Sequence, residues 1–355
     1  MFKKLFDLFK RGSKVDEENL GLIKDPRSSE EKEKDYSTDE VTFCYPPISW
    51  KEKPESEWIK FPIFFQDHSG SCVAQAVAKA LGIENYIEEE KFVHYSARDI
   101  YTRRSNYPGK GMYFKDAMEI GHKQGATFEQ LMPSQGINEE LMNDSTDRTP
   151  LTEMSAKIGR GGNYISLPLD IDAIASIIEY EKKGVVIGVR FGPSEWNRDV
   201  PQILGKDKRY GHGICATNAI LYNGKKALVI EDSWGETSGK SGRRIITKDW
   251  FDAKRISYAG YYKFFKNDGL PSQQKPKHNF KNDLYYGMRK EPEVVKLQEC
   301  LAYLKFFPSD VDFTGNFYNI TRDAVKRYQE SKGIIPTRGY VGPITRDSLN
   351  QEFSS

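Results

Sequence analysis

The sequence predicts an α+β domain with a largely antiparallel sheet, followed by a small all-α domain. Three observations carry this prediction. Apolar residues recur at helical spacing between residues 72 and 181, β-branched and aromatic runs dominate residues 185–265, and helical spacing returns after residue 284. Helices that come first and strands that come later are typical of an α+β domain.

Residues 1–40 are predicted to form a charged, mobile tail with a short amphipathic start. Residues 11–40 are too polar to offset their ordering entropy by burial. Residues 1–10 place Phe and Leu mostly on one helical face, but Asp7 and Lys10 interrupt the apolar run that a secretory signal needs. This start is either a weak interfacial anchor, a docking helix for a partner, or a frayed end without function.

Three helices are expected in the large domain, which we place at residues 41–267. The first runs from Cys72 to about Ile87, the second from Asp116 to His122 before Gly125, and the third from Asp172 to Glu181. Each has one apolar face at a spacing of three or four residues, so each is expected to pack against the core.

Four strands are expected after these helices: Val185–Val189, Ile214–Leu221, Ala227–Glu231 and Tyr258–Phe265. Asn223 and Gly224 separate the second and third runs. Asn-Gly is the dipeptide that two-residue hairpin turns prefer, because both residues must adopt positive φ. The second and third strands are therefore predicted to lie side by side.

Composition excludes several classes of protein. Lys and Arg number 53 and Asp and Glu 51, so the net charge of +2 argues against binding of nucleic acid through bulk charge. No apolar run approaches the length of about 20 residues that a transmembrane helix needs. Four cysteines in 355 residues do not make a disulfide scaffold. We expect a monomer without a metal ion or cofactor.

Cys72 is the candidate nucleophile. It begins the first predicted helix, where unpaired N–H groups and the positive end of the helix dipole stabilise a thiolate. Gln66, six residues earlier, offers an amide donor for an oxyanion beside the N–H of the nucleophile itself. A lone cysteine at a helix start is more often inert packing, so the prediction depends on its partners.

His212 and Asp232 are those partners. His212 lies between two glycines at the start of one hairpin strand, and Asp232 follows the end of the other. Because a hairpin places its strands side by side, Asp232 can reach His212. Together the residues supply a nucleophile, a base and a group that orients the base.

These motifs resemble the papain/cathepsin family of cysteine peptidases across residues 41–267. The resemblance implies a two-lobed fold, with a catalytic helix in one lobe and an antiparallel sheet or barrel in the other. It implies that Cys72 is the nucleophile, His212 the base and Gln66 the oxyanion donor, and that Asp232 stands at the usual Asn position. Trp234 would shield the His–Asp contact from water, and Gly111, Tyr210 and Gly211 would border the substrate, with Gly211 leaving an uncharged wall that favours apolar side chains.

The chain departs from the family pattern at three positions. Val73 replaces an aromatic residue, Ser69 replaces a structural cysteine, and Asp232 adds a charge. The carboxylate should raise the pKa of His212 and favour a thiolate–imidazolium pair. The residues before the domain are also too few for the inhibitory prosegment that is usual in the family, so we expect no cleaved inhibitor.

The C-terminal module, residues 284–355, follows a predicted linker at residues 268–283. Leu297, Leu301 and Leu304 form one helical stripe, Ala324, Val325 and Tyr328 a second, and Ile344 and Leu349 mark a third. Thr321 and Thr345 are N-cap candidates that each follow a glycine turn at Gly315 or Gly339. The module resembles the three-helix peptidoglycan-binding modules of wall hydrolases, which implies a glycan or stem-peptide groove with Tyr318 and Arg322 as exposed contact candidates.

The sequence therefore predicts a thiol endopeptidase that its C-terminal module tethers to peptidoglycan or a related wall polymer. Its substrate would be a protein or a peptide. Two alternatives stay open: a non-catalytic wall-binding or virion protein with a degenerate papain-like domain, and a Cys–His amidase that acts on peptidoglycan.

Overall fold

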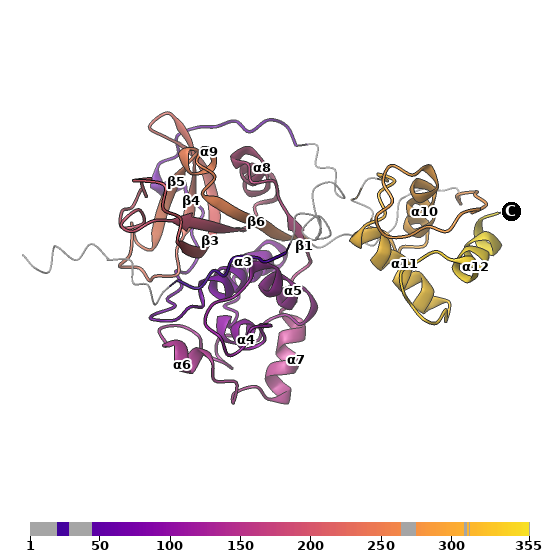
Figure 1. Ribbon diagram of the computed structural model, residues 1–355, viewed down its shortest axis with the longest axis horizontal. Coiled ribbons are helices and arrows are strands. Elements are labelled where there is room, and N and C mark those ends of the chain that lie inside the picture. The colour runs from indigo at the N-terminus through magenta and orange to yellow at the C-terminus, as the bar shows by residue number, and fades with distance from the viewer. Residues whose placement is uncertain (1–19, 28–44, 264–274, 309–310, 312, 355) are drawn as a thin grey trace, which may run out of the picture. The chain divides into compact units, whose positions relative to one another are not determined.

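The computed structural model describes residues 20–27, 45–263, 275–308, 311 and 313–354. The chain divides into two compact units, the first built on residues 20–26 and 45–262 and the second on residues 275–354 (Figure 1). The predicted amphipathic start, most of the predicted tail, Cys44 and residues 268–274 of the predicted linker lie outside the described residues.

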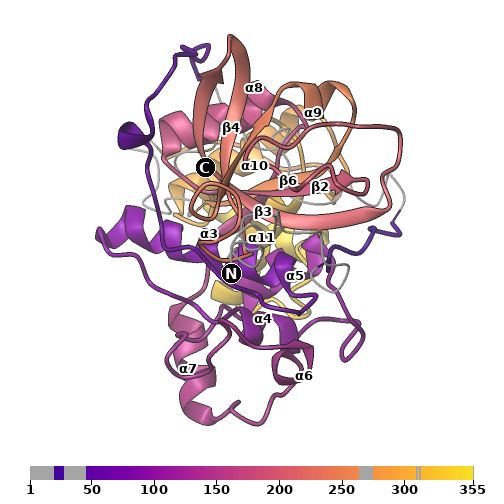
Figure 2. The same cartoon turned by 90° about the vertical axis from the view of Figure 1, so that its left-hand side faces the viewer.

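Helices α3 to α7 of the first unit lie together on one side of its sheet (Figures 1 and 2). The central helix is α3, Cys72–Glu89, in which every residue from Cys72 to Glu84 is buried. A helix buried on all sides must pair its polar residues, and Lys79 and Glu84 form ion pairs with Glu231 and Lys183. Around α3 are α4 Ala97–Thr102, α5 Phe114–Lys123, α6 Glu139–Met142 and α7 Pro150–Ile158.

The sheet has six strands in the order β1-β6-β2-β3-β4-β5. Their bounds are β1 Asn163–Ser166, β2 Val185–Phe191, β3 Tyr210–Tyr222, β4 Lys225–Glu231, β5 Arg243–Thr247 and β6 Ile256–Lys263. The pairs β6-β2, β2-β3, β3-β4 and β4-β5 are antiparallel. Two short helices, α8 Ile171–Ser176 and α9 Asp249–Asp252, and the 3-10 turn η2 Glu55–Glu57 complete this unit.

The mixed α+β fold with an antiparallel sheet is confirmed, and so is the hairpin between β3 and β4. Tyr222 pairs with Lys225 across the turn, and Asn223 and Gly224 have φ values of 49° and 73°. The third predicted helix divides into α8 and the π-helical turn η3, Ile177–Glu181. Strands β1 and β5 were not predicted from the sequence, because the apolar run within each, Tyr164–Ile165 and Ile245–Ile246, is too short to stand out.

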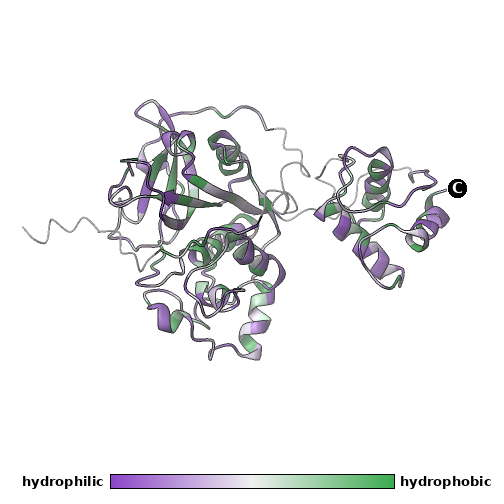
Figure 3. Ribbon diagram, in the orientation of Figure 1, coloured by the Kyte–Doolittle hydropathy of each residue, from purple (hydrophilic) through white to green (hydrophobic). Residues whose placement is uncertain are grey.

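Gly213 brings the sheet against the start of α3. A Cβ atom at Gly213 would lie 2.9 Å from Cα of Val73 and 3.2 Å from the carbonyl oxygen of Cys72. A glycine there lets β3 approach the helix closely enough to place His212 beside Cys72. Figure 3 shows hydrophobic residues along α3 and the central strands, which form the core of this unit.

Residues 20–26 contradict the prediction of a mobile tail up to residue 40. Gly21 is buried, and Leu22 and Ile23 are half-buried against the first unit. The segment pairs with Met112 and Gly211 through main-chain hydrogen bonds. Leu22 and Ile23 supply the apolar surface that the rest of the polar tail lacks.

The second unit contains α10 Pro292–Tyr303, α11 Asn319–Ser331 and α12 Pro343–Phe353. It repeats one polar arrangement twice. The side chain of Gln298 accepts from Gly315 N and donates to Thr321, and Gln329 does the same with Gly339 N and Thr345. None of the described helices combines the length and apolar content that crossing a membrane requires.

Two sequence expectations about this unit are wrong. Tyr318 and Gly342 occupy the N-cap positions, whereas Thr321 and Thr345 lie inside the first turn of α11 and α12, where they bind the two glutamines. Ile344 is 68% exposed rather than part of a third buried stripe.

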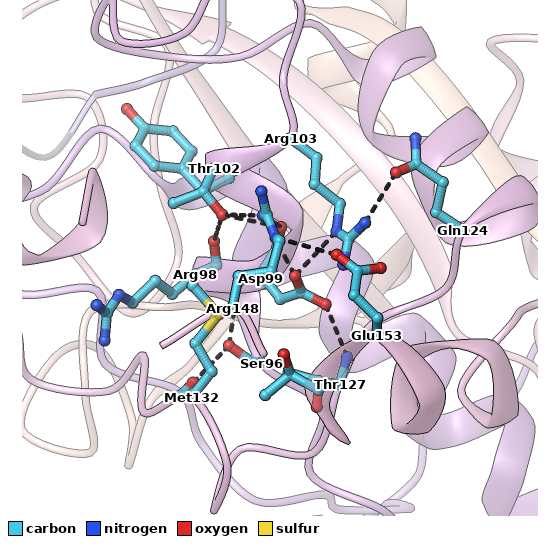
Figure 4. Close-up of polar contacts among 12 residues, drawn as sticks. Ser96, Arg98, Asp99, Thr102, Arg103, Gln124, Thr127, Met132, Arg148 and Glu153 are labelled. Carbon is cyan, nitrogen blue, oxygen red and sulfur yellow. Dashed lines mark hydrogen bonds and ion pairs between the residues drawn. The ribbon is translucent and has the colours of Figure 1, made fainter. Parts of the chain in front are cut away.

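The buried carboxylate of Asp99 joins three parts of the helical layer (Figure 4). It accepts hydrogen bonds from Arg103 Nε at 2.9 Å, from Arg148 at 3.4 Å and from the backbone N–H of Thr127 at 2.9 Å. Arg103 also binds Glu153 on α7. This network ties α4 to α7 and to the loop before residue 130.

Asp99→Ala should lower the free energy of unfolding of the first unit by about 3–5 kcal/mol, because two partly buried arginines and a buried backbone N–H lose a shared buried partner. All five tryptophans lie in the first unit, so urea unfolding followed by tryptophan fluorescence reports on it alone. Asp249→Ala, which removes an exposed pair with Lys225, is the matched control and should cost less than about 1 kcal/mol. Equal losses in the two variants would contradict this role.

Candidate active site

Cys72 is the first residue of α3, and a tight loop holds the helix start. The Ser69 hydroxyl donates to the carbonyl of Gln66 at 2.6 Å and lies 2.8 Å from the Ser71 hydroxyl. The N–H of Gly70 donates to Glu139 at 2.6 Å, which fixes this loop to α6. The thiol is therefore placed at a helix N-terminus, where the unpaired N–H groups favour negative charge.

His212 lies on β3 and is fully buried. Its Nε2 atom donates to Asp232 Oδ1 at 2.6 Å, while Nδ1 has no partner with full hydrogen-bond geometry among the described residues. Because Nε2 is engaged by the carboxylate, Nδ1 is the nitrogen that remains for Cys72. The structure thus brings together Cys72, His212 and Asp232 from α3, from β3 and from the end of β4.

The charge of Asp232 controls the protonation of His212. Burial alone would lower the pKa of the imidazole, but the charge and hydrogen bond of Asp232, with a smaller contribution from Cys72, raise it to about 9. The imidazole is therefore protonated at neutral pH, as a thiolate–imidazolium pair requires.

Asp232 is buried and accepts four hydrogen bonds. Besides His212, the backbone N–H of Ser233 binds Oδ1 at 2.9 Å, and Trp196 Nε1 and Arg244 Nε bind Oδ2 at 3.0 and 2.8 Å. Burial would raise the pKa of this carboxyl group, but His212 and Arg244 outweigh burial and hold it far below its usual range. The sequence analysis missed Trp196 and Arg244, although Arg244 lies opposite Ile230 in the β4–β5 ladder.

Two indole rings enclose the His212 ring. Trp234 lies 4.9 Å from it between ring centroids, and Trp196 makes an edge contact at 6.0 Å. Arg244 lies 5.5 Å from the centroid of the Trp234 ring. This arrangement excludes water from the His212–Asp232 hydrogen bond, which strengthens it.

Gln66 is fully buried and links the nucleophile loop to the Asp232 loop. Its Nε2 donates to the carbonyl of Ser69 at 2.7 Å, and its Oε1 accepts from the Ser233 hydroxyl at 2.5 Å. Its backbone N–H donates to the carbonyl of Ser233 at 2.8 Å. The amide plane is therefore fixed beside the loop that leads into Cys72.

Two of the residues predicted to border the substrate, Gly111 and Tyr210, make contacts within the fold. The N–H of Gly111 donates to Tyr101 and its carbonyl accepts from Asn106, so its main chain is used within the fold. The next residue, Met112, instead turns its N–H and carbonyl toward residues 21 and 23. Tyr210 is half-buried on β3 against Phe191.

The wall at Gly211 is not uncharged as expected. A Cβ atom at Gly211 would lie 2.9 Å from Arg190 Nη1, so a guanidinium from β2 occupies the space beside this glycine. Burial lowers the pKa of Arg190, and the charge of Cys72 acts in the opposite direction. Sequence alone did not reveal Arg190, because only the β2–β3 register places it opposite Gly211.

The other described cysteines do not share this environment. Cys215 and Cys300 are buried, and burial raises the pKa of each thiol to about 12. Within the part of the chain that the structure describes, no three His, Cys, Asp or Glu side chains gather as a metal site would need.

The second unit contains a groove between α11 and α12 with a volume of about 350 Å³. Ile335, Ile344 and Tyr340 line it and are 85%, 68% and 39% exposed, and Arg338 lies among them. Tyr318, expected to be exposed, is only 8% exposed, and Arg322 lies over the ring of Tyr286 and against Asp323. Both residues therefore belong to packed clusters outside the groove.

Comparisons with known proteins found similarities for each of the two units. Residues 290–349 match the family model described as "Putative peptidoglycan binding domain". Among solved structures, the chain is similar to xylellain, a cysteine protease from Xylella fastidiosa, at 17% identity and a TM-score of 0.55, over 70% of this chain and 97% of that one. It is also similar to digestive procathepsin L 3 of Tenebrio molitor larval midgut, at 15% identity and a TM-score of 0.53, over 74% and 90% of the two chains.

A third similar structure is the proform of Amb a 11, a cysteine protease and major ragweed pollen allergen, at 18% identity and a TM-score of 0.50, over 63% and 67% of the two chains. The comparison with curated proteins found no match. At these identities the likeness shows the fold: the first unit has the papain-like fold, and a peptidoglycan-binding-type module follows it.

Asp232→Asn should lower the pKa of His212, because burial and the Arg244 charge both disfavour the imidazolium once the carboxylate is gone. Iodoacetate, an anion, reacts faster with Cys72 while the imidazole is charged. The alkylation rate should therefore fall as the pH rises through the pKa of His212, with a midpoint near pH 9 in the parent protein. In Asp232→Asn this alkaline midpoint should move down by at least about one pH unit.

Peptide mapping by mass spectrometry after timed alkylation measures this midpoint at Cys72. Asp249→Asn, an exposed position on α9, is the control and should leave the midpoint in place. An unchanged midpoint in Asp232→Asn would show that the carboxylate does not set the protonation of His212.

Proposed function

We propose that this protein is a cysteine peptidase that acts by an acyl-enzyme mechanism. The observation that carries the proposal is the buried set Cys72, His212 and Asp232, in which the pKa of His212 is raised to about 9. A structural histidine in a dry core would be neutral, since burial alone lowers its pKa. A buried imidazole kept charged beside a thiol at a helix N-terminus is suited to nucleophilic catalysis.

The Cys72 thiolate attacks the carbonyl carbon of a peptide bond. The backbone N–H of Cys72 and the side-chain amide of Gln66 stabilise the oxyanion that forms. His212 then gives its proton to the leaving amine through Nδ1, and the C–N bond breaks. In the second half of the reaction, His212 takes a proton from water as the water attacks the thioester, and Cys72 is released.

Asp232 and Arg244 act together in this scheme. A lone buried carboxylate would cost several kcal/mol, but Arg244 at 2.8 Å balances its charge. The carboxylate can then hold the imidazole through Nε2 and direct Nδ1 to the thiol. Asp232, which stands where the family usually has Asn, is thus accompanied by a cation, Arg244, that balances its charge. This pairing argues against a non-catalytic protein with a degenerate papain-like domain.

The C-terminal module is proposed to tether the peptidase to peptidoglycan. The family match at residues 290–349 and the exposed groove between α11 and α12 support this assignment. The substrate would be envelope proteins or the stem peptides of the wall itself. An amidase that cuts between glycan and peptide uses the same Cys–His chemistry and is the alternative that the test must separate.

Cys72→Ala should abolish hydrolysis, lowering kcat by several orders of magnitude, because the residues of such a site act as a unit. The parent protein and the variant are compared on casein and on purified peptidoglycan, with product masses determined in each case. Cys215→Ala is the matched control, since that thiol is buried and protonated.

Cleavage of casein or of stem peptides at peptide bonds, lost in Cys72→Ala, is the expected result. Release of intact stem peptides from the glycan would instead establish the amidase. Binding without turnover on either substrate would favour the non-catalytic reading.

Ile335→Ser combined with Ile344→Ser should weaken binding to peptidoglycan by about tenfold, because both side chains are exposed in the groove and their loss removes its apolar contact surface. Sedimentation of full-length protein with purified sacculi measures the bound fraction. Tyr285→Ala, an exposed residue of the same unit outside the groove, is the control. Equal binding by all three proteins would place the contact elsewhere.

A further inference from the structure

Arg190 is a half-buried cation whose guanidinium makes no hydrogen bond or ion pair with any residue that the structure describes. Only its backbone N–H is engaged, by the carbonyl of Arg255 at 2.8 Å. The buried arginines 243, 244 and 255 of the same unit each bind a carboxylate. A guanidinium that loses water without gaining an anion is destabilised, and burial lowers the pKa of Arg190 accordingly. An anion from outside would therefore be stabilised beside it.

The register of β2 and β3 places this guanidinium near the nucleophile. Arg190 pairs with Gly211, and a Cβ atom at Gly211 would lie 2.9 Å from Nη1 and 3.1 Å from Cζ of Arg190. Residues 211 and 213 share one face of β3, because side chains alternate along a strand. That face meets the start of α3, since a Cβ atom at Gly213 would lie 3.2 Å from the carbonyl oxygen of Cys72. The charge of Cys72 accordingly acts on Arg190.

Lys110 places a second cation beside the loop that leads into Cys72. A Cβ atom at Gly70 would lie 2.8 Å from Cγ and 3.2 Å from Cε of Lys110, so the lysine stem lies across this glycine. Lys110 is exposed, and its ammonium group forms no ion pair within the described part of the chain. The start of α3 therefore has one cation from the sheet and one from the helical layer beside it.

The two carboxylates that contact this part of the site are already bound by other groups. Asp232 binds His212 and Arg244, and Glu139 accepts from the N–H of Gly70 at 2.6 Å. The positive end of the α3 dipole adds to the field of the two cations. A carboxylate on a ligand would supply the negative charge that this place lacks, whereas a cationic side chain would be repelled.

We propose that the cleft selects peptides with an acidic side chain within two residues of the bond that is cut, and that Arg190 binds this carboxylate. The argument rests on the proposed function for the role of Cys72 as a peptidase nucleophile. The planar guanidinium can bind a carboxylate through two N–H groups, and Lys110 adds a charge on a flexible stem. A preference for Glu or Asp thereby replaces the apolar preference that an uncharged wall at Gly211 predicted.

Paired peptides that differ only by Glu or Gln measure this preference on the full-length protein. The exchange is made in turn at each of the two positions on either side of the cut. At one of them, Glu should give a kcat/KM at least about tenfold above that of Gln, since the charged pair is formed only with Glu. Arg190→Met and Arg190→Gln should bring the ratio near one. Arg209→Met, which removes an exposed arginine already paired with Asp207, should keep the parent ratio.

Alkylation of Cys72 measures the same charge without a peptide substrate. Iodoacetate carries a carboxylate and iodoacetamide does not, so the ratio of their rates at pH 7 reports the charge beside the thiolate and cancels its nucleophilicity. Arg190→Met should lower this ratio at least about threefold, while the iodoacetamide rate stays that of the parent and shows an intact site. Arg190→Lys, which retains the charge, should keep the ratio within about twofold.

The two measurements separate this proposal from the proposed function. Cleavage at equal rates of the Glu and Gln peptides at all four positions would overturn Arg190 as the selecting residue and leave the peptidase in place. No cleavage of any peptide, with an alkylation ratio that falls in Arg190→Met and not in Arg209→Met, would support the carboxylate site and remove the peptidase. An alkylation ratio unchanged in Arg190→Met would overturn the carboxylate site.

Discussion

The arrangement of the first unit depends on the balance of two buried carboxylates at the end of β4. Glu231 and Asp232 are adjacent in sequence, and both are almost fully buried. Glu231 binds Lys79 of α3 and Arg243 of β5, and Asp232 binds His212 and Arg244. Buried charges persist only with such partners, so these contacts fix β4 between α3, β3 and β5 and set the register of the site.

The ion pairs of Glu231 and Asp232 differ in the role that their partners play. Glu231 pairs with Lys79 and Arg243 and has a structural role, joining the helical layer to the sheet. Asp232 takes one permanent cation, Arg244, and one group that can release its proton, His212. The permanent cation keeps the carboxylate charged in the core, and the carboxylate in turn keeps the imidazole charged beside Cys72.

The two units use glycines and glutamines in different ways. In the first unit, Gly21, Gly188 and Gly213 mark places where backbone or side chains approach too closely for a Cβ atom. In the second unit, Gln298 and Gln329 repeat one set of contacts that closes a glycine turn onto the first turn of a helix. That repetition leaves Tyr318 packed, whereas Ile335 and Ile344 remain exposed beside a groove.

The sequence by itself determined the elements whose signals are local. Helical periodicity predicted α3 and α10–α12, Asn223 and Gly224 predicted the hairpin, and motif order predicted that Cys72, His212 and Asp232 come together. Tertiary structure alone decided which distant groups complete the site. Arg244, Trp196 and Arg190 reach it through strand register and packing, which no short motif encodes. It also placed residues 20–26 against the first unit, because a polar tail with one Gly-Leu-Ile run has no signal of its own until Met112, Gly188 and Gly211 are brought together to contact it.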